Sequence, residues 1–397
     1  MKCLNVFFIQ QTNCWRKIIH LTAKMQWSLI LLFLMGQCCF IDCQLYEYLY
    51  IKKEKNWTEA QQYCREKHTD LATVSNMTDM KRLLSISAGG QRDVWIGLYD
   101  SKDVNRTWYW SLPGVEFNES ETNWNTGEPT DKVNSGNAAS ENCGILYKNL
   151  NWVDTGCQHD RYFLCYDETN RTQKYHLIRE KKTWQEAQRY CRGKHTDLIS
   201  GLKQLQDEEL KNVMKSADQD PYFGLFRDTW RWSDGSSFSF RHWNNDLNNQ
   251  QYNSGRCTAS AFNDEGRWKN DSCDQKKPFI CYDDKVILIK ENKTWEDALY
   301  YCRDNYHDLV TITNQDEQRW VQEKAKNAST DHVWMGLRYA CTLDLWFWVS
   351  DEVVSYKNWA LEPMDDCDMS GAMETRGEHK WRKKNDIEKF NFICSKD

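Results

Sequence analysis

The chain has 397 residues and a formal net charge of −6, with 28% charged and 14% aromatic residues. This length corresponds to two to four domains of ordinary size. The acidic balance argues against nucleic acid as a general partner, because no overall basic field is present to neutralise phosphates. One local basic stretch, residues 379–384, reads as a solvated loop, with an anionic ligand contact as the alternative.

The N-terminal region, residues 1–43, differs in character from the rest of the chain. Residues 27–41 form a nearly unbroken apolar run that basic residues precede. As a helix this run would extend about 22 Å, which is short of a hydrocarbon core of ~30 Å. We therefore expect a secretory signal region with cleavage near Cys43, and Met25 is an alternative start. The competing interpretation is a type II membrane protein anchored by residues 27–41.

Cysteine usage agrees with an extracellular location. Seventeen cysteines are present, and five of them fall within the N-terminal region. The other twelve are an even number, which suits pairing in an oxidising compartment. Asn-x-Ser/Thr sequons add to the case for a secreted glycoprotein. They begin at Asn56, Asn76, Asn105, Asn118, Asn170, Asn270, Asn292 and Asn327.

One phrase occurs three times along the rest of the chain. It reads Trp-x-Glu/Asp-Ala-x-x-Tyr-Cys-Arg and begins at Trp57, Trp184 and Trp295. The steps of 127 and 111 residues are too long for a solenoid unit and right for a whole domain. Each copy continues to an Asp-Leu pair and closes on an aromatic-apolar-Cys phrase. We therefore expect three related domains in series, at residues 44–167, 174–283 and 285–397.

Repeat one shows the expected elements most clearly. Alternating aromatic and apolar residues predict an opening strand at 46–51. Asn56 or Thr58 can cap a first helix that runs through Cys64, and residues 77–84 suggest a second amphipathic helix. Further strands are expected at 94–98, 108–110, 151–154 and 162–165. The long stretch between the second and third of these strands has little periodicity, which is typical of a functional or disordered loop.

Several motifs in repeat one then follow one another in a fixed order. They are Trp95-Ile-Gly-Leu98, Asn123-Trp124, Gly127-Glu-Pro129, Glu141-Asn-Cys143 and Trp152-Val-Asp154. In this order they resemble a C-type lectin-like domain, and the tandem arrangement resembles the fish macrophage mannose receptor-like C-type lectins. The resemblance covers most of the chain. It implies an α+β fold in each repeat, with two helices, small antiparallel sheets, a long irregular loop and two disulfides.

The resemblance also implies the disulfides. In that fold an outer bridge joins the first helix to the last strand, which implies Cys64–Cys165, Cys191–Cys281 and Cys302–Cys394. An inner bridge pins the long loop, which implies Cys143–Cys157 and Cys257–Cys273. Repeat three lacks the usual inner partner, so Cys341–Cys367 is inferred from the two cysteines left over, with free thiols as the alternative. Each outer bridge would close a loop worth roughly 4 to 5 kcal/mol on the chain-entropy model.

A lectin of this family holds sugar through a bound Ca²⁺, which takes six to eight oxygen ligands. The family positions map in repeat one onto Glu128, Thr130, Glu141, Val153 and Asp154, with Asp131 as an auxiliary ligand. Val153 supplies no ligand, and Thr130 replaces a carboxamide by a hydroxyl. Four carboxylates at one loop would repel one another without a cation. We expect at most one partly retained site, with calcium at Glu128, Asp131, Glu141 and Asp154, and sugar at Glu128, Thr130, Glu141 and Asp154.

Repeats two and three have lost more of these ligands. In repeat two the positions read Leu247-Asn-Asn249, Gly255 and Trp268-Lys-Asn270, so that Lys269 would bring a positive charge to the metal. A glycan at Asn270 would cover the same surface. Repeat three keeps Glu362-Pro363 but has Met364, Asp365 and Trp381-Arg-Lys383. Two cations there would suit a sulfated or sialylated glycan, or an acidic protein patch.

Other chemistries receive little support. His68, His195 and His307 recur after the first helix, but with one per repeat a surface or capping role is preferred to metal ligation. No nucleophile arrangement or phosphate loop is present, and a glycosidase pair in Glu128 and Glu141 is a remote alternative. We expect a protein that is not an enzyme and that binds glycans or glycoproteins. The runner-up is a calcium-independent, protein-binding module whose sugar sites have decayed.

Overall fold

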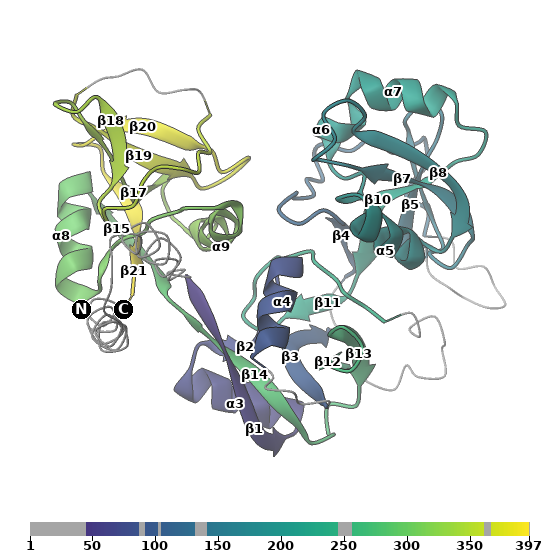
Figure 1. The fold of residues 1–397 in the computed structure, drawn as a ribbon, viewed down its shortest axis with the longest axis horizontal. Coiled ribbons are helices and arrows are strands. Elements are labelled where there is room, and N and C mark those ends of the chain that lie inside the picture. The colour runs from purple at the N-terminus through teal and green to yellow at the C-terminus, as the bar shows by residue number, and fades with distance from the viewer. Residues whose placement is uncertain are drawn as a thin grey trace, which may run out of the picture. The chain divides into compact units, whose positions relative to one another are not determined.

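The computed structural model describes residues 45–86, 92–101, 105–131, 141–244, 256–360 and 367–396 (Figure 1). The predicted leader, residues 247–249, Gly255 and residues 362–365 lie outside the described residues. The described chain divides into two units, residues 48–283 and residues 284–396 with 45–47. Within the described ranges no helix is long and apolar enough to cross a membrane.

The C-terminal unit is one contiguous copy of the expected α+β fold. Its five-strand path runs β15-β21-β17-β19-β20, and β16 and β18 pair beside it. Cys302–Cys394 and Cys341–Cys367 are both bonded, as inferred. The elements are β15 (Val286–Lys293), α8 (Trp295–Asn305), β16 (Asp308–Leu309), α9 (Gln315–Ala325), β17 (His332–Ala340), β18 (Leu345–Trp348), β19 (Met369–Glu374), β20 (Trp381–Asn385) and β21 (Phe390–Ser395).

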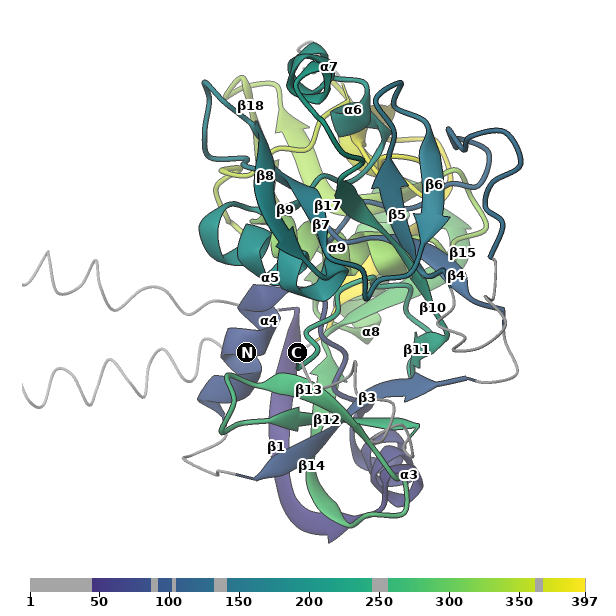
Figure 2. The same cartoon turned by 90° about the vertical axis from the view of Figure 1, so that its right-hand side faces the viewer.

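The other unit contains two more copies of this fold, and each is assembled from both repeats. The first fold takes β1 (Tyr46–Lys55), α3 (Trp57–Lys67), β2 (Asp70–Leu71), α4 (Met77–Ser85) and β3 (Asp93–Asp100) from repeat one. It is completed by repeat two, through β11 (Trp230–Trp232), β12 (Cys257–Ala261), β13 (Arg267–Asp271) and β14 (Lys277–Asp284). Its path is β1-β14-β3-β12-β13, so the purple and blue strands of repeat one lie beside the green strands of repeat two (Figure 2).

The second fold has the complementary composition. Repeat one supplies β4 (Thr107–Trp110), β5 (Cys143–Leu146), β6 (Trp152–Thr155) and β7 (Arg161–Tyr166). Repeat two supplies β8 (Tyr175–Lys182), α5 (Trp184–Lys194), β9 (Asp197–Leu198), α6 (Leu202–Leu205), α7 (Glu208–Lys215) and β10 (Tyr222–Asp228). The path β6-β5-β10-β7-β8 is equivalent to those of the other two folds. The first two repeats have therefore exchanged halves, and neither folds as the contiguous segment that was expected.

This exchange of halves changes two of the predicted disulfides. The structure joins Cys64 to Cys281 and Cys165 to Cys191, so the implied pairs Cys64–Cys165 and Cys191–Cys281 are wrong. The reason is that β14, and not β7, lies beside the central strand of the first fold, where Phe279 pairs with Trp95. The inner bridges Cys143–Cys157 and Cys257–Cys273 lie within one half each and are present as implied.

The two folds are joined by a pair of antiparallel segments that run side by side. In the first fold Leu98 pairs with Trp232, and in the second fold Leu225 pairs with Trp110. Leu98 and Leu225 hold equivalent positions in the two repeats, and so do Trp110 and Trp232. In a contiguous domain these strands would pair within one repeat, as a hairpin. Here each segment makes the same pairing with the segment of the other repeat.

The recurring tryptophan phrase is explained by contacts that all three folds share. Trp57, Trp184 and Trp295 are buried at the start of the first helix, and each indole N–H donates to a carbonyl of the central strand at 2.8–2.9 Å. The cysteine of the phrase is fully buried in its disulfide. The arginine that follows it pairs with the Asp of the Asp-Leu motif, as Arg192 does with Asp197 at 2.9 Å. The phrase is thus a framework signature, because its tryptophan, its cysteine and its arginine each find a partner within the fold.

Candidate ligand-binding site

The second fold brings together all five residues predicted for the repeat-one site. Asp154 lies on β6, and its carboxylate accepts hydrogen bonds from the backbone N–H groups of Thr130 and Asp131, both at 2.9 Å. Thr130 N–H also lies 3.0 Å from Glu128, and its hydroxyl lies 3.2 Å from Glu141. We call Glu128, Thr130, Asp131, Glu141 and Asp154 the loop cluster. Its assembly follows from the sequence, whereas its role stays a prediction.

Two arginines that were not predicted from the sequence accompany these acidic residues. Nη2 of Arg227 lies 2.9 Å from Asp154 and 2.9 Å from Asp131. Arg106 makes a close ion pair with Asp131 on the other side. The loop cluster therefore has internal positive charge, which offsets the mutual repulsion of its carboxylates.

Arg227 is held firmly in this position. Its guanidinium stacks 4.5 Å from the ring of Trp108 and donates twice to the carbonyl oxygen of Glu141. Its side chain is only 9% exposed, and this burial lowers the pKa of the guanidinium from its usual value. A buried guanidinium with two carboxylates and an aromatic face is a built feature of the fold and not an incidental surface pair.

Arg227 reaches the loop cluster because the repeats have exchanged halves. It lies on β10 of repeat two, and the equivalent residue on β3 of repeat one is Asp100. In a contiguous first domain Asp100 would face the loop cluster instead, and would add a negative charge. No motif within repeat one could reveal this cation, because its position depends on which half-domains pair.

Ca²⁺ is the cofactor that the resemblance implies, and the residues present fit it poorly. The carboxylates of Asp131 and Asp154 are already shared with guanidinium groups. Val153 offers no oxygen at a ligand position, and it is 9% exposed. Burial, a hydrogen bond with Asp154 and the charge of Asp154 raise the pKa of Glu128. Calcium at Glu128, Asp131, Glu141 and Asp154 thus remains a prediction.

The corresponding surfaces of repeats two and three carry cations, as the sequence suggested. Lys269 of the first fold lies 3.8 Å from Asp93. Arg382 of the third fold pairs with Glu374 at 2.7 Å, and Lys384 lies 3.7 Å from Glu388. Arg382 therefore has an acidic partner within its own fold, which weakens the expectation of an anionic ligand there.

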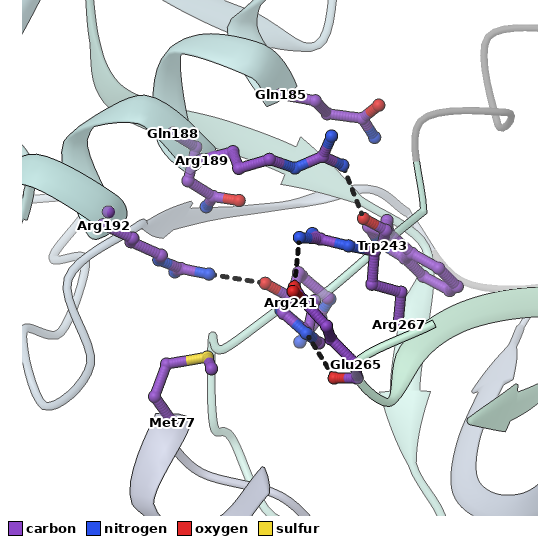
Figure 3. A pocket seen from close by; sticks show the side chains of 11 residues that line it. Met77, Gln185, Gln188, Arg189, Arg192, Arg241, Trp243, Glu265 and Arg267 are labelled. Carbon is purple, nitrogen blue, oxygen red and sulfur yellow. Dashed lines mark hydrogen bonds and ion pairs between the residues drawn. The ribbon is translucent and has the colours of Figure 1, made fainter. Parts of the chain in front are cut away.

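A separate cavity of about 180 Å³ lies beside α5, at the contact between the exchanged halves of repeat two (Figure 3). Arg192 of α5 donates to the carbonyl oxygen of Arg241 at 2.6 Å, and Arg189 donates to that of Trp243 at 3.5 Å. The carboxylate of Asp228 accepts two hydrogen bonds from Arg241, at 2.8 and 3.2 Å. These charged groups are paired within the protein. We call the cavity and the residues that line it the polar seam, because it lies where the two halves of repeat two meet.

The polar seam contains a strongly perturbed histidine. Burial, followed by the positive charges of Arg192 and Arg267, lowers the pKa of His242 to about 4. His242 is therefore neutral at physiological pH, and its protonation would oppose the folded state.

The predicted glycosylation sites differ in accessibility. Asn76 is only 5% exposed, and its side-chain oxygen accepts from the backbone of Asp79 at the start of α4. Its amide nitrogen lies 3.2 Å from the hydroxyl of Ser75. A glycan at Asn76 would require this cap to open. The other seven sequon asparagines are half-buried or exposed, and their modification stays a prediction.

Comparison with known proteins decides the family. The model of the Lectin C-type domain matches residues 53–167, 180–283 and 291–396. The chain belongs to the C-type lectin family. Its three α+β folds are therefore C-type lectin folds, and membership in a family of recognition domains agrees with the prediction of a protein that is not an enzyme.

The relatives include multidomain receptors. Human C-type mannose receptor 2 is 24% identical over 360 residues, which cover 77% of this chain and 24% of the receptor. Human lymphocyte antigen 75 is 23% identical over 400 residues, which cover 86% of this chain and 22% of that protein. This C-type lectin thus spans about a quarter of the length of these relatives. Among solved structures, human lithostathine is 26% identical over 28% of this chain and 82% of its own, with a TM-score of 0.26.

Proposed function

We propose that this C-type lectin is an extracellular, non-catalytic recognition protein whose loop cluster binds glycans without a requirement for Ca²⁺. The observation that carries the proposal is the position of Arg227, within 2.9 Å of both Asp131 and Asp154. A guanidinium there supplies the positive charge that a metal would otherwise bring. Glycan binding thereby becomes a matter of hydrogen bonds to the protein alone.

The chemistry of the loop cluster suits sugar hydroxyls. The carboxylate oxygens of Glu141 accept hydrogen bonds, and the hydroxyl of Thr130 can both donate and accept. Glu128, whose pKa is raised, is half-buried, so that a ligand can reach it. Glycans that carry neighbouring hydroxyls are therefore the proposed ligands, as free glycans or on glycoproteins. A single site of this kind would be weak, so repeated epitopes on the ligand would strengthen binding.

Two alternatives make different predictions. In the first, repeat one retains a calcium-dependent site of the mannose type at Glu128, Asp131, Glu141 and Asp154. In the second, the loop surfaces bind protein ligands and no longer recognise sugar. The tryptophan-rich construction of all three folds does not discriminate, because most of these tryptophans are buried.

Retention of the secreted full chain on immobilised mannose and on a panel of other glycans, with and without a chelator, separates these functions. We expect retention that the chelator leaves unchanged and that Glu128→Gln reduces. Glu119→Gln is the matched control, because Glu119 is exposed and lies outside the loop cluster. Retention abolished by the chelator would support the calcium-dependent alternative, and failure on every glycan would support the protein-binding one. Either result would refute the proposal.

A further inference from the structure

The second fold contains a cluster of metal-ligating side chains at the junction between the two repeats. Asp167 follows β7, His176 lies on β8, and His195 caps the C-terminus of α5. Their ligand atoms all lie within 4.8 Å of one another. His195 alone suggested a cap in the sequence, since no second histidine lies nearby in the chain. The pairing of β7 with β8, and the packing of α5 against them, bring that second histidine into place.

Asp167 is fixed with one oxygen directed toward the cluster. Its Oδ1 accepts hydrogen bonds from the backbone N–H groups of Thr169 and Asn170 at 3.0 and 3.1 Å, and from the Thr169 hydroxyl at 2.7 Å. Its Oδ2 lies 3.3 Å from Nδ1 of His195. The hydrogen bonds from Thr169, and then from His195, lower the pKa of Asp167 to about 2. The carboxylate is thus ionised and oriented, as a metal ligand must be.

His176 presents a free ring nitrogen to the same place. Its ring stacks on that of His195, with centroids 4.3 Å apart and an interplanar angle of 24°. Its Nε2 is buried without a hydrogen-bond partner, so the backbone hydrogen bond with Gln173 is made by Nδ1. Burial and the neighbouring His195 lower the pKa of His176, which keeps the imidazole neutral. A histidine whose other nitrogen donates to a backbone carbonyl is a common arrangement of metal ligands, because that bond fixes the tautomer and the ring.

The other two folds lack this combination. His68 makes the same pair with Asp283, at 3.1 Å, but the position of His176, eight residues before the tryptophan that begins the helix, is taken there by Leu49. In the third fold Tyr306 holds the position of His195 at the end of α8, and Lys396 replaces the aspartate. The first two folds therefore share the His–Asp pair, whereas the described residues at these positions in the third fold do not form it. Only His176 adds the third ligand and the unpartnered nitrogen.

We infer that Asp167, His176 and His195 form a zinc-binding site in which water supplies the fourth ligand. Two imidazoles and one carboxylate suit Zn²⁺, and three protein ligands with an open position are a known form of zinc site. Zn–N and Zn–O distances of about 2.0–2.2 Å place the ligand atoms roughly 3.4 Å apart, which side-chain rotations can reach. The side chains of His195 and Asp167 are 16% and 15% exposed, which leaves access for the ion and its water.

Zinc at this position would tie the segment between the repeats to α5 and β8. Because the ligands are already assembled in the folded chain, zinc would bind the folded state in preference to the unfolded one. Binding of this kind raises the thermal midpoint in proportion to the logarithm of metal concentration. Acidification would weaken binding, because protons compete for both imidazoles.

Titration of Zn²⁺ into the metal-free, full-length secreted protein tests the site. We expect one equivalent to bind, with a rise in the thermal midpoint, and Co²⁺ in its place to give the visible absorption of a tetrahedral ion. His176→Gln and Asp167→Asn should each weaken Zn²⁺ binding at least about tenfold. His68→Gln and Asp283→Asn are the matched controls, because they alter the equivalent pair of the first fold, and they should leave binding unchanged.

Three results would overturn the inference. The first is no saturable Zn²⁺ binding to the folded wild-type protein. The second is binding that His176→Gln leaves intact while its disulfides and tryptophan fluorescence show a native fold. The third is equal loss in the His68→Gln control, which would indicate nonspecific binding to surface histidines. Glycan retention is not a readout here, so failure of this site is distinguishable from failure of the proposed function.

Discussion

Arg227 is the residue on which the behaviour of the loop cluster depends. The Asp154 side chain that it contacts is fully buried, and Arg227 itself is 9% exposed. Removing one partner of a buried ion pair leaves the other charge uncompensated, which usually costs about 3–5 kcal/mol. The loop cluster would then hold four carboxylates and only Arg106 as a cation.

This arrangement predicts that Arg227→Gln will destabilise the protein and make it sensitive to calcium. The thermal midpoint of the variant should fall without added metal and recover partly in millimolar Ca²⁺, because the freed carboxylates can then share the ion. The wild-type midpoint should not move with Ca²⁺. Arg231→Gln is a suitable control, because Arg231 donates to carbonyl and hydroxyl oxygens. An equal Ca²⁺-induced rise in the wild type would show that Arg227 does not replace the metal.

His242 predicts a pH dependence with a definite sign. Its folded pKa of about 4 lies below the ordinary value of 6.5, so the unfolded chain binds more protons between these two pH values. Its contribution to stability is therefore fully present above pH 6.5 and is lost as pH falls toward 4. His242→Gln should reduce the acid-induced drop in the urea midpoint across this window. A variant whose pH profile coincides with that of the wild type would contradict the assignment.

At the scale of elements, the turn between β10 and β11 accounts for the exchange of halves. Suppose that β10 paired with β11 of its own repeat, in the register that β3 and β11 show between repeats. Arg227 would then face Trp230, and only Asp228 and Thr229 would be left to form the turn. Two-residue hairpin turns need residues that tolerate positive φ, typically Asn-Gly or Asp-Gly. A β-branched Thr tolerates it poorly, and neither residue has positive φ in the structure. Short, strained hinge loops favour exchange of this kind.

The third repeat supports this interpretation. Its β17–β18 hairpin is closed, with Ala340 paired to Leu345 across a four-residue turn. That turn places Asp344 at a φ of 55°, which Asp accepts more readily than a β-branched residue does. The same fold is thus contiguous where the turn is long enough to close.

Thr229→Gly should therefore shift the protein toward contiguous folding. It creates an Asp-Gly turn, which favours the closed β10–β11 hairpin. We expect Cys64–Cys165 and Cys191–Cys281 to appear in a disulfide map of the variant. Thr229→Ala, which removes the β-branch without permitting positive φ at low cost, should retain mainly the wild-type pairs. A variant map identical to that of the wild type would show that the turn does not govern the exchange.

The close approach of β2 to the central strand sets a second requirement on an element. A Cβ added to Gly97 on β3 would lie 2.9 Å from the carbonyl oxygen of Leu71, which is backbone and cannot rotate away. Gly97→Ala should therefore cost about 1–3 kcal/mol by overpacking. Gly193→Ala on the exposed face of α5 meets nothing within 4 Å, and should instead stabilise by up to about 1 kcal/mol. Urea denaturation of both variants measures the difference, and equal effects would contradict it.

At the scale of the whole molecule, the sequence predicted local structure correctly but did not predict which half-domains pair. The tryptophan phrase, the first helix and the loop cluster each lie within one half-domain, so their residues predict their structure. The outer disulfides join two halves, and the buried surfaces of both repeats are alike. Cys64 can therefore meet Cys281 or Cys165 on the same framework, and no motif discriminates between them.

The same limitation explains what was missed at the functional sites. Arg227 lies about a hundred positions along the chain from Asp131, and only the pairing of β10 with β4 and β5 brings it to the loop cluster. His176 was missed for a different reason. Its role depends on the position of β8 beside the end of α5, which the sequence does not show. The histidine after the first helix was the one sequence signal for the proposed zinc site, and a search for histidines on the first strand of each repeat would have added His176.

The exchange of halves is the central claim, because it places Arg227 in the loop cluster and so supports calcium-independent binding. A disulfide map of the protein, made by digestion without reduction and mass spectrometry of the linked peptides, tests it directly. The structure predicts Cys64 linked to Cys281 and Cys165 linked to Cys191. Recovery of Cys64 linked to Cys165 and Cys191 linked to Cys281 would contradict it, and would return Asp100 to the position that Arg227 now occupies.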